Sequence, residues 1–302
     1  MAEKPTNPRR FARQNAVIRT LIQLVFFLAM PGAFVAGFNG VKAIFQAVGA
    51  GQPLAWTGFT MALVVLCLFT IVFGRFFCGW VCAFGALGDF VYWLSGLVQK
   101  KLFRRKKQFR LPERWLPLGQ KLKYLILAAI VVLCALNCYS ALGIWSPWEV
   151  FSLLTALRLP PAGSVVAVVL LVLIVVGMAL QERFFCQFLC PMGAVFSLLP
   201  ILPFGQLRRA ADRCPSGCEL CKRRCPVSVR MDEDNLRKGE CIACDRCADT
   251  CPHGNLSRWD RRLLRRPWIG ALGKAAAFFA LGAALGLCRF FYTCRPPLGR
   301  GG

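Results

Sequence analysis

The sequence predicts an all-α membrane bundle of four to five transmembrane helices, with a repeated helix pair, joined to a small cysteine-rich domain. Three observations lead to this prediction: 57% of the 302 residues are hydrophobic, the formal net charge is +24, and eight of the 17 cysteines form two short runs. Soluble globular domains rarely combine so apolar a composition with such a charge. The combination is typical of a membrane protein with basic flanks.

Five apolar stretches are long enough to cross a hydrocarbon core of roughly 30 Å, which takes about 20 helical residues. They lie near Val17–Phe38, Ala55–Phe73, Tyr124–Ile144, Ser164–Leu180 and Trp268–Leu287. The first stretch follows a basic segment, as in a signal peptide, but its apolar run is too long and lacks a clear cleavage site. We therefore interpret it as a retained helix.

Lysine and arginine flank these stretches and do not form a soluble basic domain, which argues against nucleic-acid binding. The basic groups are Arg9, Arg10, Arg13 and Arg19; Lys100, Lys101, Arg104, Arg105, Lys106 and Lys107; and Arg208, Arg209 and Arg213. The loops after the first and third stretches carry only Lys42 and Arg158. By the positive-inside rule, the basic groups are cytoplasmic. We expect a transmembrane domain over 1–207, a cytoplasmic domain over 208–266, and a fifth span with a short tail over 267–302.

Two segments align without gaps and predict an internal duplication. The first runs from Arg75 to Ala86 and the second from Arg183 to Ala194. Both begin Arg-Phe-Phe-Cys, have a second cysteine four residues later and end in Gly-Ala. Because each copy follows an even-numbered stretch, we expect two parallel helix pairs related by an axis along the membrane normal. That symmetry would bring the cysteine pairs together.

Four cysteines of the duplication are candidate ligands for an additional redox or metal site: Cys78, Cys82, Cys186 and Cys190. A spacing of four residues puts both thiols of a pair on one helix face, with Cβ atoms about 5–6 Å apart. Thiolates are the usual ligands of iron–sulfur clusters and zinc, and the nearby Arg75 and Arg183 would favour the thiolate form. The alternative is that these cysteines are small hydrophobes packed in helices. The duplication of the pair favours the ligand role.

A soluble segment follows the fourth stretch and holds nine of the 14 acidic residues. Its cysteine runs are Cys214, Cys218, Cys221 and Cys225, followed by Pro226, and Cys241, Cys244, Cys247 and Cys251, followed by Pro252. The second run has the spacing of bacterial ferredoxins, in which the fourth cysteine of each run ligates the other cluster. We therefore predict two [4Fe–4S] clusters in a ferredoxin-like segment. The first is held by Cys214, Cys218, Cys221 and Cys251, and the second by Cys241, Cys244, Cys247 and Cys225.

Zinc is the rival interpretation of paired C-x2-C elements, but two runs that each end in Cys-Pro favour clusters. Disulfides are disfavoured because a cytoplasmic segment faces a reducing compartment. The first run departs from the ferredoxin spacing, since three residues separate Cys214 from Cys218. We expect Gly217 to absorb the extra residue, and Cys214 is the weakest of the eight assignments.

The two C-x3-C elements, Cys78/Cys82 and Cys186/Cys190-Pro191, together with the two cysteine runs, resemble the NapH/MauN family of membrane ferredoxin-type proteins. That family is related to the membrane parts of NosR and CcoG. The resemblance covers the second stretch through Cys251, but Ala83 replaces the proline expected after the first element and a fifth stretch follows the clusters. It implies a quinol dehydrogenase subunit of the bacterial inner membrane. Electrons would pass from the quinol pool towards a periplasmic redox enzyme through companion iron–sulfur or cytochrome subunits.

Two other functions stay open. The relation to CcoG allows a copper-handling or assembly factor that uses the duplicated thiols as a metal relay, and a structural interpretation makes the chain an anchor for a soluble partner. For a quinol site, Glu149 and Glu182 are candidate proton acceptors. The alternatives are an aromatic belt around Glu149 and an ion pair of Glu182 with Arg183. A disulfide among Cys134, Cys138, Cys288 and Cys294 is a further alternative. No catalytic residue is assigned.

Overall fold

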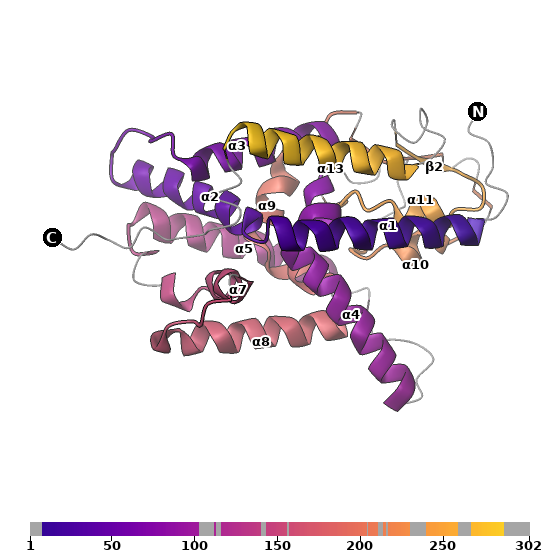
Figure 1. The fold of residues 1–302 in the computed structure, drawn as a ribbon, viewed down its shortest axis with the longest axis horizontal. Helices are drawn as coiled ribbons and strands as arrows, with labels where there is room; N and C mark the ends of the chain where they lie inside the picture. Colours follow the sequence, from indigo (N-terminus) through magenta and orange to yellow (C-terminus); the bar gives the residue numbers. More distant parts are fainter. Residues whose placement is uncertain are drawn as a thin grey trace.

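The computed structural model describes residues 8–102, 112, 116–139, 143–155, 157–203, 205–210, 214–215, 217–229, 240–258 and 267–286. Within these ranges the regular secondary structure is helical apart from one two-stranded sheet. Figure 1 shows α1 and α13 running along the long axis, with the short elements of the cysteine-rich segment at the end where α1 begins. The short helix α7 lies towards the other end. Of the predicted basic groups, Arg104, Arg105, Lys106, Lys107 and Arg213 lie outside the described residues.

The first half of the bundle contains four α-helices and one π-helical turn. These are α1 (Pro8–Ala29), α2 (Ala33–Gly49), α3 (Gly58–Phe73), the turn η1 (Phe77–Val81) and α4 (Ala83–Leu102). The second half contains α5 (Leu116–Ala135), η2 (Gly143–Trp145), α7 (Pro147–Thr155), η3 (Ala162–Ser164), α8 (Val165–Leu180), the π-helical turn η4 (Phe185–Leu189) and α9 (Pro191–Leu198).

The duplication extends over more of the chain than the predicted helix pair. In the first half α1 packs against η1 and α4, and in the second half α5 packs against η4 and α9. Likewise α2 packs on α3, and α7 packs on α8. Each half therefore places one helix beside its π-helical turn and another beside the helix that precedes the turn. The aromatic rings of Phe34, Phe84 and Phe185 join the halves at the centre of the core, with centroids 4.4–5.9 Å apart.

Two of the predicted spans are wrong in their extent. The stretch Val17–Phe38 is not one helix, because α1 and α2 meet at a break between Ala29 and Ala33 and are bent by 61°. Pro31 in this break has no backbone N–H with which to continue the helix. The stretch Tyr124–Ile144 lies too late in the chain, since α5 already ends at Ala135, and Asn137 takes a left-handed backbone conformation with φ 56°.

Among the described residues, α5 is long and apolar enough to cross a membrane alone, and the bent pair α1–α2 would make a second span if counted together. The other predicted spans form apolar but shorter helices. Helix α3 starts late because Thr57 caps it, its side chain accepting a hydrogen bond from the Thr60 N–H at 3.3 Å. Helix α8 ends at Leu180, and α13 covers Pro267–Ala284.

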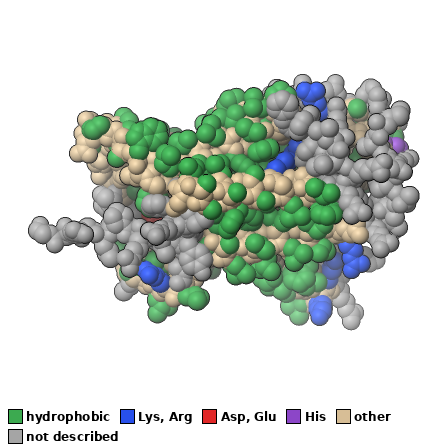
Figure 2. Space-filling view, turned by 45° about the horizontal axis from the view of Figure 1, so that its top comes forward, with side chains coloured by type: hydrophobic (Ala, Val, Ile, Leu, Met, Phe, Trp, Pro, Cys, Tyr) green, Lys and Arg blue, Asp and Glu red, His purple; other side chains and the backbone are tan. Residues whose placement is uncertain are grey.

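Large apolar side chains point away from the bundle on these helices. Leu68 of α3 is 57% exposed, and Val172 and Leu173 of α8 are 55% and 59% exposed. Figure 2 shows hydrophobic side chains over most of the middle of the visible face, with most of the Lys and Arg towards the end that carries the single histidine. A helix that is apolar on its inner and outer faces suits an apolar surrounding.

The cysteine-rich segment folds around two short helices and one small antiparallel sheet. The helices are α10 (Leu220–Arg224) and α11 (Arg246–Thr250), which pack against each other. Strands β1 (Arg208–Arg209) and β2 (Leu256–Ser257) pair at the ends of the segment. Helix α1 packs against α11 and ties the segment to the bundle. The division into three domains remains a prediction.

Candidate cofactor sites

Four cysteines of the cysteine-rich segment surround one largely enclosed cavity: Cys225, Cys241, Cys244 and Cys247. Its remaining wall is apolar except for Asp245. These are the four cysteines that the sequence assigns to one cluster, and they come from both runs. A set of four thiols around an apolar cavity fits the donor chemistry of a [4Fe–4S] cluster. Their role as ligands remains a prediction.

The backbone curls around this cavity. Ala243 and Asp245 both take left-handed conformations, with φ 55° and 58°. In the other loop, the Val229 N–H donates to the Cys225 Sγ at 3.4 Å. Burial raises the pKa of Cys225 to about 12, and it also raises the pKa of Cys241 and Cys247. These three thiols therefore hold their protons when free, and a bound metal would have to displace them.

The cysteines of the other predicted cluster are more exposed, since three of the four are only half-buried. The sulfurs of Cys214 and Cys221 lie close enough to interact electrostatically. The Asn255 side-chain amide faces the Cys214 Sγ at 3.6 Å. Gly217 has φ +75° with open space around it, so the extra residue of the first run is taken up by a conformation that suits glycine. This ligand set also remains a prediction.

The four-cysteine cavity lies directly against the first π-helical turn. A Cβ on Gly79 would collide with the carbonyl oxygen of Ile242, in the loop between Cys241 and Cys244. One residue further, the Trp80 indole N–H donates to the Ala243 carbonyl at 3.0 Å in a buried hydrogen bond. The cysteine-rich loop therefore rests backbone to backbone on η1.

The second π-helical turn holds the other loop of the cavity. Gln187 occupies the position in η4 that Gly79 occupies in η1. Its buried side-chain amide donates to the Pro226 carbonyl at 2.8 Å and to the Glu182 carbonyl at 2.7 Å. The two copies of the duplication thus contact the two loops that contribute the cavity cysteines.

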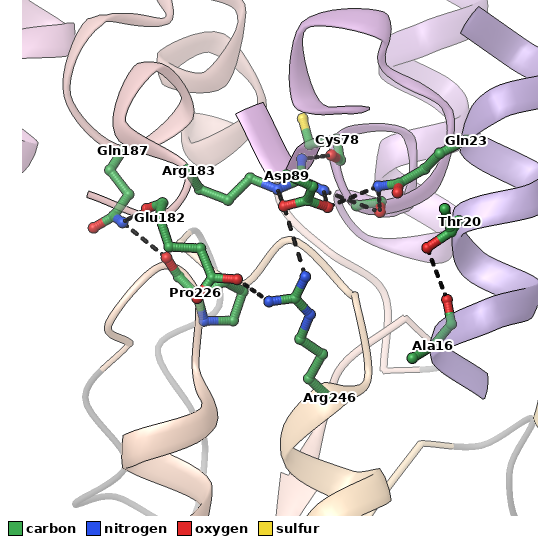
Figure 3. Close-up of polar contacts among 11 residues, drawn as sticks. Ala16, Thr20, Gln23, Cys78, Asp89, Glu182, Arg183, Gln187, Pro226 and Arg246 are labelled. Atoms are coloured by element: carbon green, nitrogen blue, oxygen red, sulfur yellow. Dashed lines mark hydrogen bonds and ion pairs between the residues drawn. The ribbon is translucent and has the colours of Figure 1, made fainter. Parts of the chain in front are cut away.

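Asp89 of α4 connects both halves of the bundle with the cysteine-rich segment (Figure 3). Arg183 donates to its carboxylate through Nε at 2.8 Å and through Nη2 at 2.6 Å. Arg246 of α11 approaches the same carboxylate at 3.7 Å, and Gln23 of α1 donates to it at 3.0 Å. Arg246 also pairs with Glu182. The alternative pairing of Glu182 with Arg183 is therefore wrong, because Asp89 already receives the Arg183 fork.

Arg75 occupies in the first copy the position that Arg183 occupies in the second. It pairs with a carboxylate of the cysteine-rich segment. Its guanidinium lies 3.5 Å from Glu240, which immediately precedes Cys241. Glu240 also pairs with Lys123 and accepts a hydrogen bond from the Tyr124 hydroxyl at 2.9 Å. Although burial opposes ionisation of Glu240, Arg75 and Lys123 outweigh it and lower the pKa of this carboxyl group.

All four cysteines of the duplication are buried, at 5–6% exposure: Cys78, Cys82, Cys186 and Cys190. The sulfur of Cys190 is within electrostatic range of the other three. Cys190 also caps α9, since its Sγ accepts a hydrogen bond from the Gly193 N–H at 3.1 Å. Among the described residues, no three His, Cys, Asp or Glu side chains are spaced to hold a single metal ion.

The sequence analysis did not single out Asp89, although the composition of its helix carried a signal for it. Asp89 is the sole acid in an otherwise apolar and basic helix, and a lone acid in such a helix calls for a buried partner. Glu149, a candidate proton acceptor in the sequence, pairs with Lys42 at 2.9 Å. Cys134 and Cys138 are free thiols, whereas Cys288 and Cys294 lie outside the described residues.

Comparison with known proteins relates the chain to iron–sulfur proteins. A family model described as a 4Fe–4S binding domain matches residues 54–110 and 164–202, which contain the two π-helical turns. The chain is 30% identical to the uncharacterized protein MJ0750 of Methanocaldococcus jannaschii, over 80% of this chain and 94% of that protein.

Two relatives carry descriptive names. The methylamine utilization ferredoxin-type protein MauN of Methylobacillus flagellatus is 28% identical over 72% of this chain and 76% of its own length. The ferredoxin-type protein NapH of Escherichia coli is 25% identical over 68% of this chain and 69% of its own length. No solved structure matches the chain.

Proposed function

Because the chain belongs to the NapH/MauN-type family of ferredoxin-like iron–sulfur electron-transfer proteins, we propose that it is a quinol dehydrogenase subunit of the bacterial inner membrane. It would oxidise quinol and pass electrons towards a periplasmic redox enzyme through companion iron–sulfur or cytochrome subunits. The observation that carries this proposal is the four-cysteine cavity resting on the first π-helical turn.

The cysteine-rich segment would hold two [4Fe–4S] clusters, which supply one-electron transfer when bound. One would be held by Cys225, Cys241, Cys244 and Cys247, and the other by Cys214, Cys218, Cys221 and Cys251. Other side chains keep the first site in place: Trp80 anchors its loop from one side and Gln187 from the other. Arg246 fixes α11 to the bundle through its pairs with Asp89 and Glu182.

The membrane setting is supported by the outward apolar side chains and by the distribution of charge (Figure 2). Four to five helical segments would lie within the bilayer, including the bent pair α1–α2 and the shorter helices α3, α8 and α13. Lys100 and Lys101 end α4. By the positive-inside rule, these basic residues and the cysteine-rich segment would face the cytoplasm.

A groove between α5 and η4 offers a place for quinol. It has a volume of about 590 Å³, within the range of small-molecule sites, and its lining is almost entirely apolar. Leu122 and Leu125 of α5 form one wall, and Phe184 and Phe188 form the other. Phe188 lies between Cys186 and Cys190 in the chain, so an apolar ring in this groove would lie beside the second π-helical turn.

Quinol oxidation can be tested with the full chain reconstituted anaerobically in lipid vesicles. A soluble quinol analogue should reduce the clusters, seen as bleaching of their visible absorbance. Leu122→Trp, which fills the groove, should slow this reduction tenfold or more without changing the iron content. Leu173→Trp, on the exposed face of α8, is the matched control and should reduce at the wild-type rate.

Two results would contradict the proposal. If dithionite reduces the clusters and the quinol analogue does not, electron transfer stands and the quinol assignment fails. If the purified chain contains zinc and no iron, the electron-transfer function fails as well.

The four buried cysteines of the duplication also favour a second candidate, a copper-handling or assembly factor of the CcoG type. Thiolates prefer soft Cu(I). This candidate predicts that the wild-type chain binds Cu(I), and that binding is lost when Cys78, Cys82, Cys186 and Cys190 are each replaced by serine. Cu(I) binding that survives these replacements would exclude it.

A further inference from the structure

We propose that the two copies of the duplication form a single shared site for one iron–sulfur cluster, with Cys78 and Cys82 from the first half and Cys186 and Cys190 from the second. This site would be additional to the two in the cysteine-rich segment. It does not depend on the identity of the electron donor.

The first observation is that both copies build the same local structure. Each places its first cysteine inside a buried π-helical turn and its second cysteine directly before the following helix, so that Cys82 precedes α4 and Cys190 precedes α9. The Gly193 N–H donates to the Cys190 Sγ at 3.1 Å. Amides and the positive end of a helix favour a thiolate at this position.

The second observation is that the two arginines of the duplication cross from one half to the other. Arg183 donates to the carbonyls of Cys78 at 2.6 Å and of Gly79 at 3.4 Å. In return, Arg75 reaches the second half, where a Cβ added at Gly193 would lie 3.0 Å from its Nη2 atom. Each arginine therefore lies beside the cysteine turn of the opposite copy.

This crossing explains the glycine that the two copies share. A Cβ on Gly85 would collide with Nη1 of Arg183. A Cβ on Gly193 would be tight against both Arg75 and the Cys190 Sγ, at 3.0 and 3.4 Å. The absence of a side chain at both positions admits the arginine of the other half. The halves are therefore fitted to each other around the cysteines, and not merely packed side by side.

Charge favours a cluster over four neutral thiols. Arg75 and Arg183 are buried, at 1% and 2% exposure, and both interact electrostatically with the Cys186 sulfur. Four thiolates around a [4Fe–4S] core leave a net charge of about −2, and the two guanidinium groups, although each also pairs with a carboxylate, lower the cost of burying that charge. The aromatic rings of Phe84 and Phe185, stacked at 4.4 Å, cover the neighbouring core and keep water away.

The family match supports cluster binding at these residues, because the segments described as a 4Fe–4S binding domain contain both turns and none of the cysteine-rich segment. The site would exchange single electrons with the cluster at Cys225, Cys241, Cys244 and Cys247, whose loops rest on the same turns. One electron leaves the donor cluster and one enters the acceptor, and no proton or bond changes. The contacts of Gly79 and Gln187 place the loops of this site against both π-helical turns.

The test is the iron content of the full chain, purified anaerobically in detergent and measured per chain by mass spectrometry. Since each [4Fe–4S] cluster contributes four irons, the wild type should contain about twelve. Cys78→Ser and Cys186→Ser should each contain about eight, and the double variant should lose no more than either single variant. Cys67→Ser, in α3 and away from the turns, is the matched control and should keep about twelve.

The iron lost in the double variant, compared with that lost in each single variant, distinguishes one shared site from two separate sites. If each copy held its own cluster, the double variant would lose twice as much iron as a single variant. A wild-type chain with about eight irons, unaffected by either variant, would overturn the site and leave the two-cluster function intact. One bound zinc or copper ion at these cysteines would also overturn it.

The wild-type iron count decides the proposal even if the serine variants do not fold. Gly193→Ala gives a second readout, because it keeps all four cysteines and pushes a methyl group against Arg75 and the Cys190 Sγ. We expect about twelve irons and a shifted midpoint potential for one of three signals in electron paramagnetic resonance. Three unchanged signals would contradict the position of the site.

Discussion

The two copies of the duplication have similar sequences and both form a π-helical turn, but they differ in how they bind the cysteine-rich segment. In the second copy, Arg183 receives its carboxylate from within the bundle, at Asp89, whereas Arg75 in the first copy depends on Glu240 of the cysteine-rich segment. Ser197 stands in the second copy where Asp89 stands in the first. The difference teaches that the arginine of the second copy pairs with a carboxylate from the first half of the bundle, while the arginine of the first copy pairs with a carboxylate of the cysteine-rich segment.

The two copies also differ in the groups with which they contact the loops of the four-cysteine cavity. The first copy offers a bare backbone at Gly79 and an indole at Trp80, and the second copy offers the long amide of Gln187. The close backbone contact at Gly79 leaves no room for an added atom, whereas the flexible side chain of Gln187 can shift its amide group. The first copy is therefore expected to be the more sensitive of the two to substitution.

The largest effect is expected from Asp89→Asn. The change removes the carboxylate charge that pairs with Arg183 and leaves this buried guanidinium uncompensated, while Arg246 keeps its pair with Glu182; the loss costs about 3–5 kcal/mol in the free energy of unfolding. Denaturant titration of the detergent-solubilised chain measures this. The matched control is Ser197→Ala at the equivalent position, which loses a hydroxyl bonded to the Gly193 carbonyl and should cost about 1 kcal/mol. Equal losses for the two variants would contradict the asymmetry.

Glu240→Gln should have the next largest effect. It removes the carboxylate charge shared by Arg75 and Lys123, and loss of charge-assisted bonds in a largely buried site costs about 1.5–3 kcal/mol. The same titration measures the change. Glu219→Gln is the control, because Glu219 pairs with Arg223 at an exposed site and should change stability by less than about 1 kcal/mol. Should both variants be equally stable, the docking role of Glu240 is wrong.

Gly79→Ala should loosen the first contact. Its added methyl group collides with the Ile242 carbonyl, and relief of such overpacking costs about 1–3 kcal/mol. Hydrogen exchange should become faster over residues 241–247, where the loop is displaced. Gln187→Ala, the equivalent position in the second copy, should instead speed exchange around residues 225–229. Identical exchange patterns in the two variants would mean that the copies do not contact separate loops.

The smallest effect is expected from Trp80→Phe, which makes the first copy resemble Phe188 of the second. It removes one buried hydrogen bond to the Ala243 carbonyl, worth about 0.5–1.5 kcal/mol, and keeps an aromatic ring in place. Denaturant titration should show this loss with an unchanged iron content. A loss of iron would show that the indole supports the cluster site itself.

The spacing of the cysteines in the sequence predicts much of the candidate cofactor site. The spacing of Cys241, Cys244 and Cys247, with Cys225 from the other run, names four residues that the structure brings to one cavity. This works because ligand spacing is a local property of a short loop. The duplication likewise predicts that Cys78 and Cys186 meet, since similar segments related by a symmetry axis face each other.

Contacts between distant segments could not be predicted in this way. The pairing of Asp89 with Arg183 joins residues 94 positions apart, and no local pattern selects Arg183 over another base. Helix ends were also missed, because hydropathy does not register the break at Pro31 or the left-handed Asn137 that follows α5. The π-helical turns were predicted as ordinary helix, since one extra residue per turn leaves no mark on an apolar sequence.

The central claim is that Cys225, Cys241, Cys244 and Cys247 hold an electron-transferring cluster against the first π-helical turn. A potentiometric titration followed by electron paramagnetic resonance, with wild-type chain and Cys244→Ser compared, tests it most directly. We predict that the variant loses one reducible [4Fe–4S] signal and keeps the others, while the quinol analogue no longer drives electrons through the chain. An unchanged spectrum and unchanged electron flow in Cys244→Ser would contradict the account.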